Sequence, residues 1–303
     1  MRDNLPSFLQ AYDRLCATGE QFPDAEHYTV DTGLTFEHHS GPRPILIDQR
    51  ALRASGVVYT NDYHLWSALH QHGVYTDASV NLLNTLQTHF EDMSSLIWGL
   101  SGYASVLPGV SYDKEGEGIN ALYETLLTKG YPPSLVVDGG VREGCLGLNG
   151  VIAKLKRISS LGIIPIKGLA NVGIRDLTAV CGKTYQDREE HVGTIPDVLV
   201  CVGGDGLRSD GTKGGTLREC EYAIANGSVV LLLKLRDYSP TSLPGSYRRL
   251  SHLVEAEVNG RLFVCEKLSD IPLYIERVLR AIWETLVFSR GQRQPKLAHL
   301  LNT

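Results

Sequence analysis

The chain has 303 residues, of which 43% are hydrophobic and 21% charged, and its formal net charge is −5. These proportions are typical of a globular protein, and the negative charge argues against nucleic acid or an anionic membrane surface as the main partner. No apolar run approaches the roughly 20 residues of a membrane span, and the first 15 residues lack the apolar core of a signal peptide. We therefore expect a cytoplasmic protein.

The cysteines and histidines show no metal-ligand spacing. Six cysteines are scattered without a CxxC pair, which is typical of small buried side chains in a reducing compartment. Most of the histidines lie in the first 90 residues, and none forms an HxxxH pair or an HExxH motif. We expect no metal and no cofactor.

Residues 1–93 are predicted to form an N-terminal extension or small subdomain of mixed, partly helical structure. The polar stretch before residue 44 carries no clear periodicity. Short apolar runs predict strands at 45–47 and 57–60, and apolar periodicity predicts helices at 62–72 and 77–90. We expect this part to pack against the main fold.

From residue 94 the pattern becomes regular. Apolar runs predict strands at residues 95–100, 134–137, 163–166, 197–202, 229–233 and 262–265. Helical patterns lie between or after them, at residues 119–129, 147–160, 216–225 and 270–288. Apolar strands separated by helices favour a parallel sheet covered on both faces. We predict an α/β fold with a Rossmann-like doubly wound parallel sheet over residues 94–288, followed by a tail at 289–303.

Glycines follow several of the predicted strands. They are Gly102 after Ser101, the pair Gly139-Gly140, Gly168, and the pair Gly203-Gly204. In parallel sheets ligands bind at the carboxyl ends of the strands, and glycine lets the backbone approach a ligand closely. We therefore predict a glycine-rich ligand cleft at this edge of the sheet.

The strongest motif is the run Gly203-Gly204-Asp205-Gly206, followed by Gly214-Gly215-Thr216 at the start of a helix. Backbone N–H groups of such a loop and the positive end of the helix favour a phosphate. The run is neither a Walker A loop nor a GxGxxG fingerprint. Thr216 and Glu219 also have the spacing of a capping box, so a purely structural role for these two is the alternative.

A second loop begins with Asp138-Gly139-Gly140 and continues to Gly147 within a glycine-rich helix start. Its form predicts a further phosphate or ribose contact. The alternative is tight packing of the helix on the strand.

Three segments together resemble the SLOG superfamily: VVDGGVREGCLGLNGVIA, GIIPIKG, and VLVCVGGDG with GGTLRECEYAIANGSVVLLL. This Rossmann-like group includes the lysine-decarboxylase-like phosphoribohydrolases of the lonely-guy type and DprA-related nucleotide-binding proteins. The resemblance covers about residues 94–288. It implies that a nucleotide or nucleotide-derived small molecule binds in the cleft. The alternative it implies is a hydrolase that cleaves the N-glycosidic bond of a nucleoside 5′-monophosphate.

The resemblance also assigns roles to particular residues. Glu219 matches the glutamate of the superfamily's GGxGTxxE motif, and a second register, through Gly206 and Asp210, loses its Thr and Glu. Arg188 lies where the phosphoribohydrolases have the arginine of an Arg-Lys pair, with Glu189 in place of the lysine. In an enzyme Arg188 would anchor phosphate or ribose, and Glu219 would stabilise the ribosyl centre or activate water.

Three further expectations complete the prediction. The wide apolar face of the helix at 270–288 predicts a homo-oligomer, unless that face only covers the sheet. Arg188 stands in the charged run QDREEH, which could equally be a solvated helix face. The loop at 207–213 is longer than in the superfamily, and we expect it to influence the choice of ligand.

Overall fold

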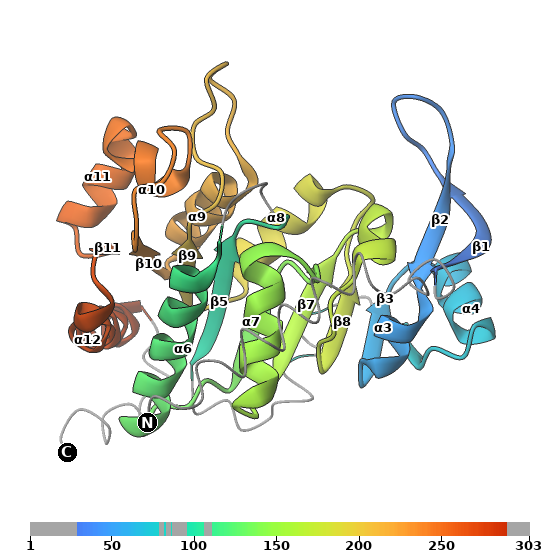
Figure 1. Ribbon diagram of the computed structural model, residues 1–303, viewed down its shortest axis with the longest axis horizontal. Coiled ribbons are helices and arrows are strands. Elements are labelled where there is room, and N and C mark those ends of the chain that lie inside the picture. Colours follow the sequence, from blue (N-terminus) through green and yellow to red (C-terminus); the bar gives the residue numbers. More distant parts are fainter. Residues whose placement is uncertain (1–28, 79–81, 83–85, 87–95, 106–110, 290–303) are drawn as a thin grey trace.

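The computed structural model describes residues 29–78, 82, 86, 96–105 and 111–289, with side chains described up to residue 283. Within these residues a nine-stranded sheet runs in the order β11-β10-β9-β5-β6-β7-β8-β3-β4, with helices on both faces (Figure 1). Every neighbouring pair in it is parallel. The predicted Rossmann-like α/β fold is confirmed.

Two series of strands spread from the middle of the sheet. One comprises β5 (Ile97–Gly102), β6 (Leu135–Asp138), β7 (Ser160–Ile164) and β8 (Leu177–Val180). The other comprises β9 (Val198–Val202), β10 (Val229–Leu233) and β11 (Leu262–Cys265). The direction of the series reverses between β5 and β9, so the topological switch point, where such sheets bind ligands, lies there.

The helices divide between the two faces of the sheet. The longer ones are α6 (Asp113–Thr128), α7 (Gly144–Leu155), α8 (Tyr185–Thr194), α9 (Gly215–Asn226), α11 (Ser251–Val258) and α12 (Ile271–Ser289). The short ones are α10 (Leu243–Ser246) and the 3-10 turns η1 (Ile166–Asn171), η2 (Tyr247–Arg249) and η3 (Leu268–Asp270). Alternate residues of β9 point to opposite faces: Val200 packs in the cluster that contains α6, α7 and α12, and Leu199 in the cluster that contains α9 and α11.

The N-terminal part joins the same sheet. Its elements are β1 (Thr29–Phe36), β2 (Arg43–Asp48), α3 (Gln49–Ala54), β3 (Val57–Thr60), α4 (Tyr63–Gln71) and β4 (Thr76–Asp77). β1 and β2 pair as a separate antiparallel hairpin, whereas β3 pairs with β8 and β4 with β3. The strands predicted at 45–47 and 57–60 and the helix at 62–72 are confirmed. The helix predicted at 77–90 lies almost wholly outside the described residues, and the division of the chain at residues 93 and 288 stays a prediction.

Strand β8 and helix α8 of the main fold were not predicted, and neither was the two-residue edge strand β4. Strand β8 is only four residues long. Helix α8 carries no apolar stripe, because two of the residues on its buried side are Arg188 and Glu189. It begins with a capping box formed by Thr184 and Asp187, which is the local signal that could have located it.

Helix α12 packs against α6 and β10. Its buried side chains belong to the core: Ile271, Ile275, Val278, Leu279 and Ile282. Up to residue 283 most of the apolar face of the helix therefore packs into the core, whereas Leu273 is 50% exposed. The homo-oligomer stays a prediction.

Candidate functional site at the carboxyl edge of the sheet

The glycine-bearing strand ends lie next to one another at the switch point. In the parallel pair β5 and β9, Gly102 is level with Val202, so Gly203-Gly204 follows directly beside the end of β5. Strand β6, which leads into Gly139-Gly140, is the other neighbour of β5. The structure thus brings three of the four predicted glycine segments together at one edge, those at Gly102, Gly139-Gly140 and Gly203-Gly204.

Glu219 lies beneath this edge and is buried, with 5% of its surface exposed. Its carboxylate accepts a hydrogen bond from the hydroxyl of Ser101 on β5, which is itself fully buried. Burial raises the pKa of Glu219 to about 7, although Arg188 and the Ser101 hydroxyl oppose the rise. The carboxyl group therefore exchanges its proton near neutral pH.

The capping-box alternative for Thr216 and Glu219 is wrong. Helix α9 begins at Gly215 with Gly214 as its N-cap, and no side chain caps it. Thr216 is then the second helical residue, and the Glu219 side chain is engaged by Ser101 on the neighbouring strand. The two residues are free of the structural role that their spacing predicted.

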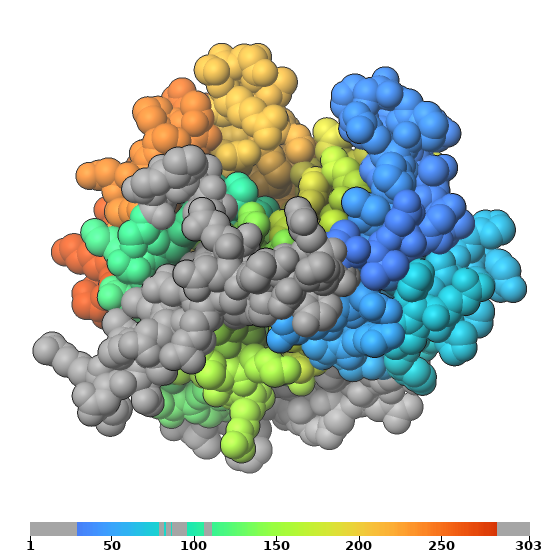
Figure 2. All heavy atoms as spheres, turned by 45° about the vertical axis from the view of Figure 1, so that its right-hand side comes forward, coloured from blue at the N-terminus to red at the C-terminus, as the bar shows by residue number. Residues whose placement is uncertain are grey.

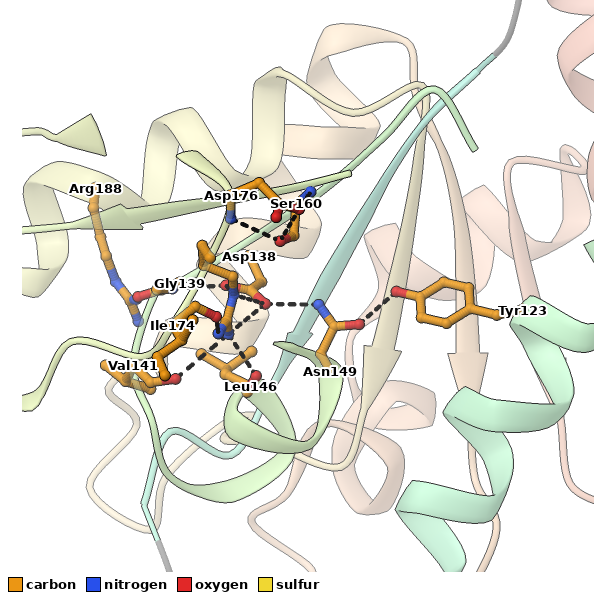
Figure 3. Close-up of polar contacts among 12 residues, drawn as sticks. Tyr123, Asp138, Gly139, Val141, Leu146, Asn149, Ser160, Ile174, Asp176 and Arg188 are labelled. Atoms are coloured by element: carbon orange, nitrogen blue, oxygen red, sulfur yellow. Dashed lines mark hydrogen bonds and ion pairs between the residues drawn. The ribbon is translucent and has the colours of Figure 1, made fainter. Parts of the chain in front are cut away.

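Arg188 is buried as well, with 6% exposed, so the solvated-face alternative for this residue is wrong. Its Nη1 donates to the carbonyl of Gly139 (Figure 3). Its guanidinium lies 5.0 Å from the centre of the Tyr185 ring. Within the described part of the chain its buried Nε–H has no hydrogen-bond partner. Buried donors are nearly always satisfied, so this Nε–H can donate to an acceptor outside the described residues.

Glu189 does not act as the lysine it replaces. Its carboxylate pairs with Arg218, with Nη2 of the arginine 2.9 Å from Oε1, and so links α8 to α9. A Cβ at Gly215 would lie 2.9 Å from the same Oε1. The pair therefore fixes the start of α9 against α8, a role that the charged run QDREEH did not reveal.

The loop after β9 folds back onto the start of α9. Gly203 and Gly204 both have positive φ, +65° and +81°, which favours glycine. The N–H of Leu217 donates to the carbonyl of Asp205 at 3.1 Å, and the N–H of Gly214 donates to the carbonyl of Gly206 at 2.8 Å. The end of β9 and the start of α9 are thereby held together.

The remaining predicted residues have structural contacts. A Cβ at Gly206 would overlap the Ser246 hydroxyl, and one at Gly139 would overlap Arg188. Gly147 is buried inside α7, so packing of that helix on the sheet accounts for it. The Asp205 side chain is exposed and pairs with Arg208 at 3.2 Å, within the long loop at 207–213.

The substitution Gly204→Ala is expected to test how tightly this loop meets α9. A Cβ at Gly204 would overlap the side chain of Thr216, whereas at Gly211, which has the same φ of +81°, nothing lies within 4 Å. Gly211→Ala should lower the free energy of unfolding by about 1 kcal/mol, the conformational cost alone. Gly204→Ala should lower it by at least about 1 kcal/mol more. Urea unfolding of both variants measures the difference, and equal losses would contradict the close approach.

A buried ion pair that was not predicted lies beneath the Gly139 loop (Figure 3). Arg175 and Asp138 are 2% and 1% exposed, with Nη2 of the arginine 2.8 Å from Oδ2 of the aspartate. Asn149 donates to the same carboxylate oxygen at 2.6 Å, and Tyr123 donates to Asn149. Arg175 also donates to the carbonyl of Leu146 at 2.6 Å, so the network ties the loop to α7.

The surface is hollowed at this edge. In Figure 2 the β1–β2 hairpin, in blue, and the segment that follows β9, in yellow-orange, rise on either side of the hollow. Among the residues that the structure describes, no group of histidine, cysteine and carboxylate side chains is arranged to hold a metal ion. In the same part of the chain no helix is long and apolar enough to span a bilayer.

Comparison with known proteins yields structural similarity alone. No protein-family model matches the sequence, and no curated protein matches it. A molybdenum cofactor binding protein from Rippkaea orientalis is similar with a TM-score of 0.44 and 21% identity, covering 62% of this chain and 99% of that one. The molybdenum cofactor carrier protein of Chlamydomonas reinhardtii gives a TM-score of 0.42 and 17% identity, covering 61% and 99%. Similarity at this level carries no conclusion about what this chain binds.

Proposed function

We propose that the chain binds a nucleotide or nucleotide-derived ligand, with its phosphate at the junction of β9 and α9. The observation that carries this is a set of backbone donors. Within the described residues, no hydrogen bond engages the N–H groups of Gly203, Gly204 and Asp205, or those of Gly215 and Thr216. Converging N–H groups at a glycine loop and a helix N-terminus form an anion site.

The charges around this junction suit an anion. Arg188 brings a buried positive charge and an unpartnered Nε–H to the Gly139 loop beside it. Glu219, the buried carboxyl nearby, has a pKa of about 7, so it is largely uncharged in mildly acidic solution and repels an anion weakly there. We therefore assign Arg188 as the side chain that completes the phosphate site.

Isothermal titration with AMP and GMP tests the proposal. The wild-type chain should bind at least one of them, and Arg188→Met should weaken that binding at least about tenfold, since hydrogen bonds to charged groups contribute about 1.5–3 kcal/mol. Arg277→Met is the matched control, because Arg277 is exposed on α12, away from the strand ends. Absence of nucleotide binding, or equal binding by Arg188→Met, would overturn the proposal.

The pKa of Glu219 favours one second candidate, hydrolysis of the N-glycosidic bond of a nucleoside monophosphate. A carboxyl group that titrates near pH 7 suits general acid–base catalysis, and Glu219 is also held by Ser101. Incubation with nucleoside monophosphates should then release free base, and Glu219→Gln should abolish the release. If the nucleotide binds but no free base is released, hydrolysis is excluded and binding remains as the proposed function.

A further inference from the structure

Two tyrosine rings close on Gly203, the first residue of the loop. A Cβ at Gly203 would lie 2.8 Å from Cε2 of Tyr103 and 3.1 Å from Cε1 of Tyr238. Tyr103 follows β5 and Tyr238 follows β10, and these strands are the two neighbours of β9. The rings therefore reach Gly203 from both sides of the strand end. We call them the tyrosine pair.

The hydroxyl of Tyr238 points into the protein. The hydroxyl oxygen is fully buried and lies near Glu115, whereas the residue as a whole is partly exposed. The exposed part of Tyr238 is thus the rest of the residue and not its polar end. Burial and the nearby Glu115 carboxylate both raise the pKa of Tyr238, so the side chain is uncharged in neutral solution.

Arg236 contacts the same ring. Its guanidinium lies 5.3 Å from the centre of the Tyr238 ring, and its Nε lies 2.7 Å from Oε1 of the buried Glu115. Its Nη1 donates to the carbonyl of Ser111 at 3.0 Å. These contacts give the ring a fixed position, which reduces the entropy lost when a second ring stacks on it.

Tyr103 is held in a similar way. Its carbonyl accepts a hydrogen bond from the N–H of Cys145 at 2.8 Å, and its ring meets that of Tyr112 edge-on at 6.3 Å. It too is partly exposed. Both rings are therefore rigid aromatic groups beside the loop that carries the proposed phosphate donors.

We propose that the tyrosine pair binds the heteroaromatic ring of the ligand by stacking. This rests on the proposed function, because Gly203 is adjacent to Gly204 and so places the pair beside the proposed phosphate site. Aromatic side chains stack on any base, since every base has a π-face. The pair thus assigns an orientation, with the phosphate toward α9 and the ring toward the ends of β5 and β10.

Ribose 5-phosphate has the phosphate but no base, so comparing it with AMP separates the contribution of the ring to binding from that of the phosphate. Stacking contributes about 1–3 kcal/mol per base, so wild-type protein should bind AMP about 5- to 150-fold more tightly than ribose 5-phosphate. Tyr238→Leu and Tyr103→Leu should each reduce this preference at least about threefold and leave the affinity for ribose 5-phosphate unchanged. Tyr238→Phe keeps the ring and should keep the preference. Tyr63→Leu is the control, because Tyr63 is 72% exposed on α4.

The titrations distinguish failure of the ring subsite from failure of the proposed function. Equal wild-type binding of AMP and ribose 5-phosphate overturns the ring subsite and leaves the proposed function standing. If the leucine variants lose affinity for AMP and for ribose 5-phosphate equally, and their Tm falls, the tyrosine pair has only a packing role. This outcome also overturns the ring subsite. If ribose 5-phosphate, AMP and GMP all fail to bind, the proposed function itself fails. If a leucine variant does not fold, the wild-type comparison and Tyr238→Phe still decide, since loss of preference in Tyr238→Phe contradicts stacking.

Discussion

Arg175→Met is expected to lower the free energy of unfolding by about 3–5 kcal/mol, because it leaves the carboxylate of Asp138 buried without its counter-charge. Both partners are almost wholly buried, at 2% and 1% exposed. Nε of Arg175 also lies 3.2 and 3.1 Å from the two carboxylate oxygens, so the pair is bidentate. Urea unfolding followed by far-UV circular dichroism measures the loss.

Two further variants test whether charge is the cause. Lys234→Met removes a partner of Glu266 from a pair whose side chains are 33% and 57% exposed, and it should lower the free energy of unfolding by less than about 1 kcal/mol. Adding Asp138→Asn to Arg175→Met removes the unpaired charge and should recover part of the loss. A loss for Arg175→Met as small as that for Lys234→Met would contradict the interpretation.

The ion pair matters for the site because of where it lies. The N–H of Gly140 donates to Oδ1 of Asp138 at 2.8 Å, and the carbonyl of Gly139 accepts from Arg188. The carboxylate therefore fixes the loop against which the buried arginine of the proposed phosphate site is held. The network also reaches α7 through Asn149. The ion pair thus positions Arg188 through the Gly139 loop, without itself contacting a ligand.

Most of the fold could be predicted because the strands of the main sheet are short apolar runs. Strands β9 (Val198–Val202) and β10 (Val229–Leu233) are buried on both faces, so their residues form uninterrupted apolar runs in the sequence. Helix α8 could not be predicted in this way, since its buried side carries Arg188 and Glu189. Strand β1 alternates half-buried with exposed residues inside a polar stretch, so its signal was weak.

The candidate site could be predicted only where its residues are consecutive in the sequence. Glycines after a strand and before a helix located the loop from Gly203 to Thr216. Pairs that are distant in sequence left no local signal: Asp138 and Arg175 are 37 residues apart, and Ser101 and Glu219 are 118 apart. The capping-box spacing of Thr216 and Glu219 was misleading, because the glutamate bonds across to β5 and not back to its own helix.

The stability of the chain is expected to fall as pH rises through neutrality, and Glu219→Gln should remove much of that fall. The folded-state pKa of Glu219, about 7, lies above the ordinary value of a glutamate side chain, 4.5. The native state therefore binds the proton more tightly than the unfolded state. The associated stability is fully present below about pH 4.5 and is lost as pH rises to about 7. Between pH 5 and pH 8 the loss amounts to about 2–3 kcal/mol, at 1.36 kcal/mol per pKa unit.

Glu219→Gln isolates this contribution, because the amide oxygen can still accept the hydrogen bond from Ser101 while the group can no longer ionise. Urea unfolding at pH 5 and at pH 8 should show that the variant gains about 2–3 kcal/mol relative to wild type over this interval. Glu266→Gln is the control, since that carboxylate is 57% exposed. A constant difference between Glu219→Gln and wild type at both pH values would mean that Glu219 is ionised throughout. In that case its carboxylate would repel a phosphate at the β9–α9 junction, and both the binding proposal and the hydrolytic candidate would lose their electrostatic support.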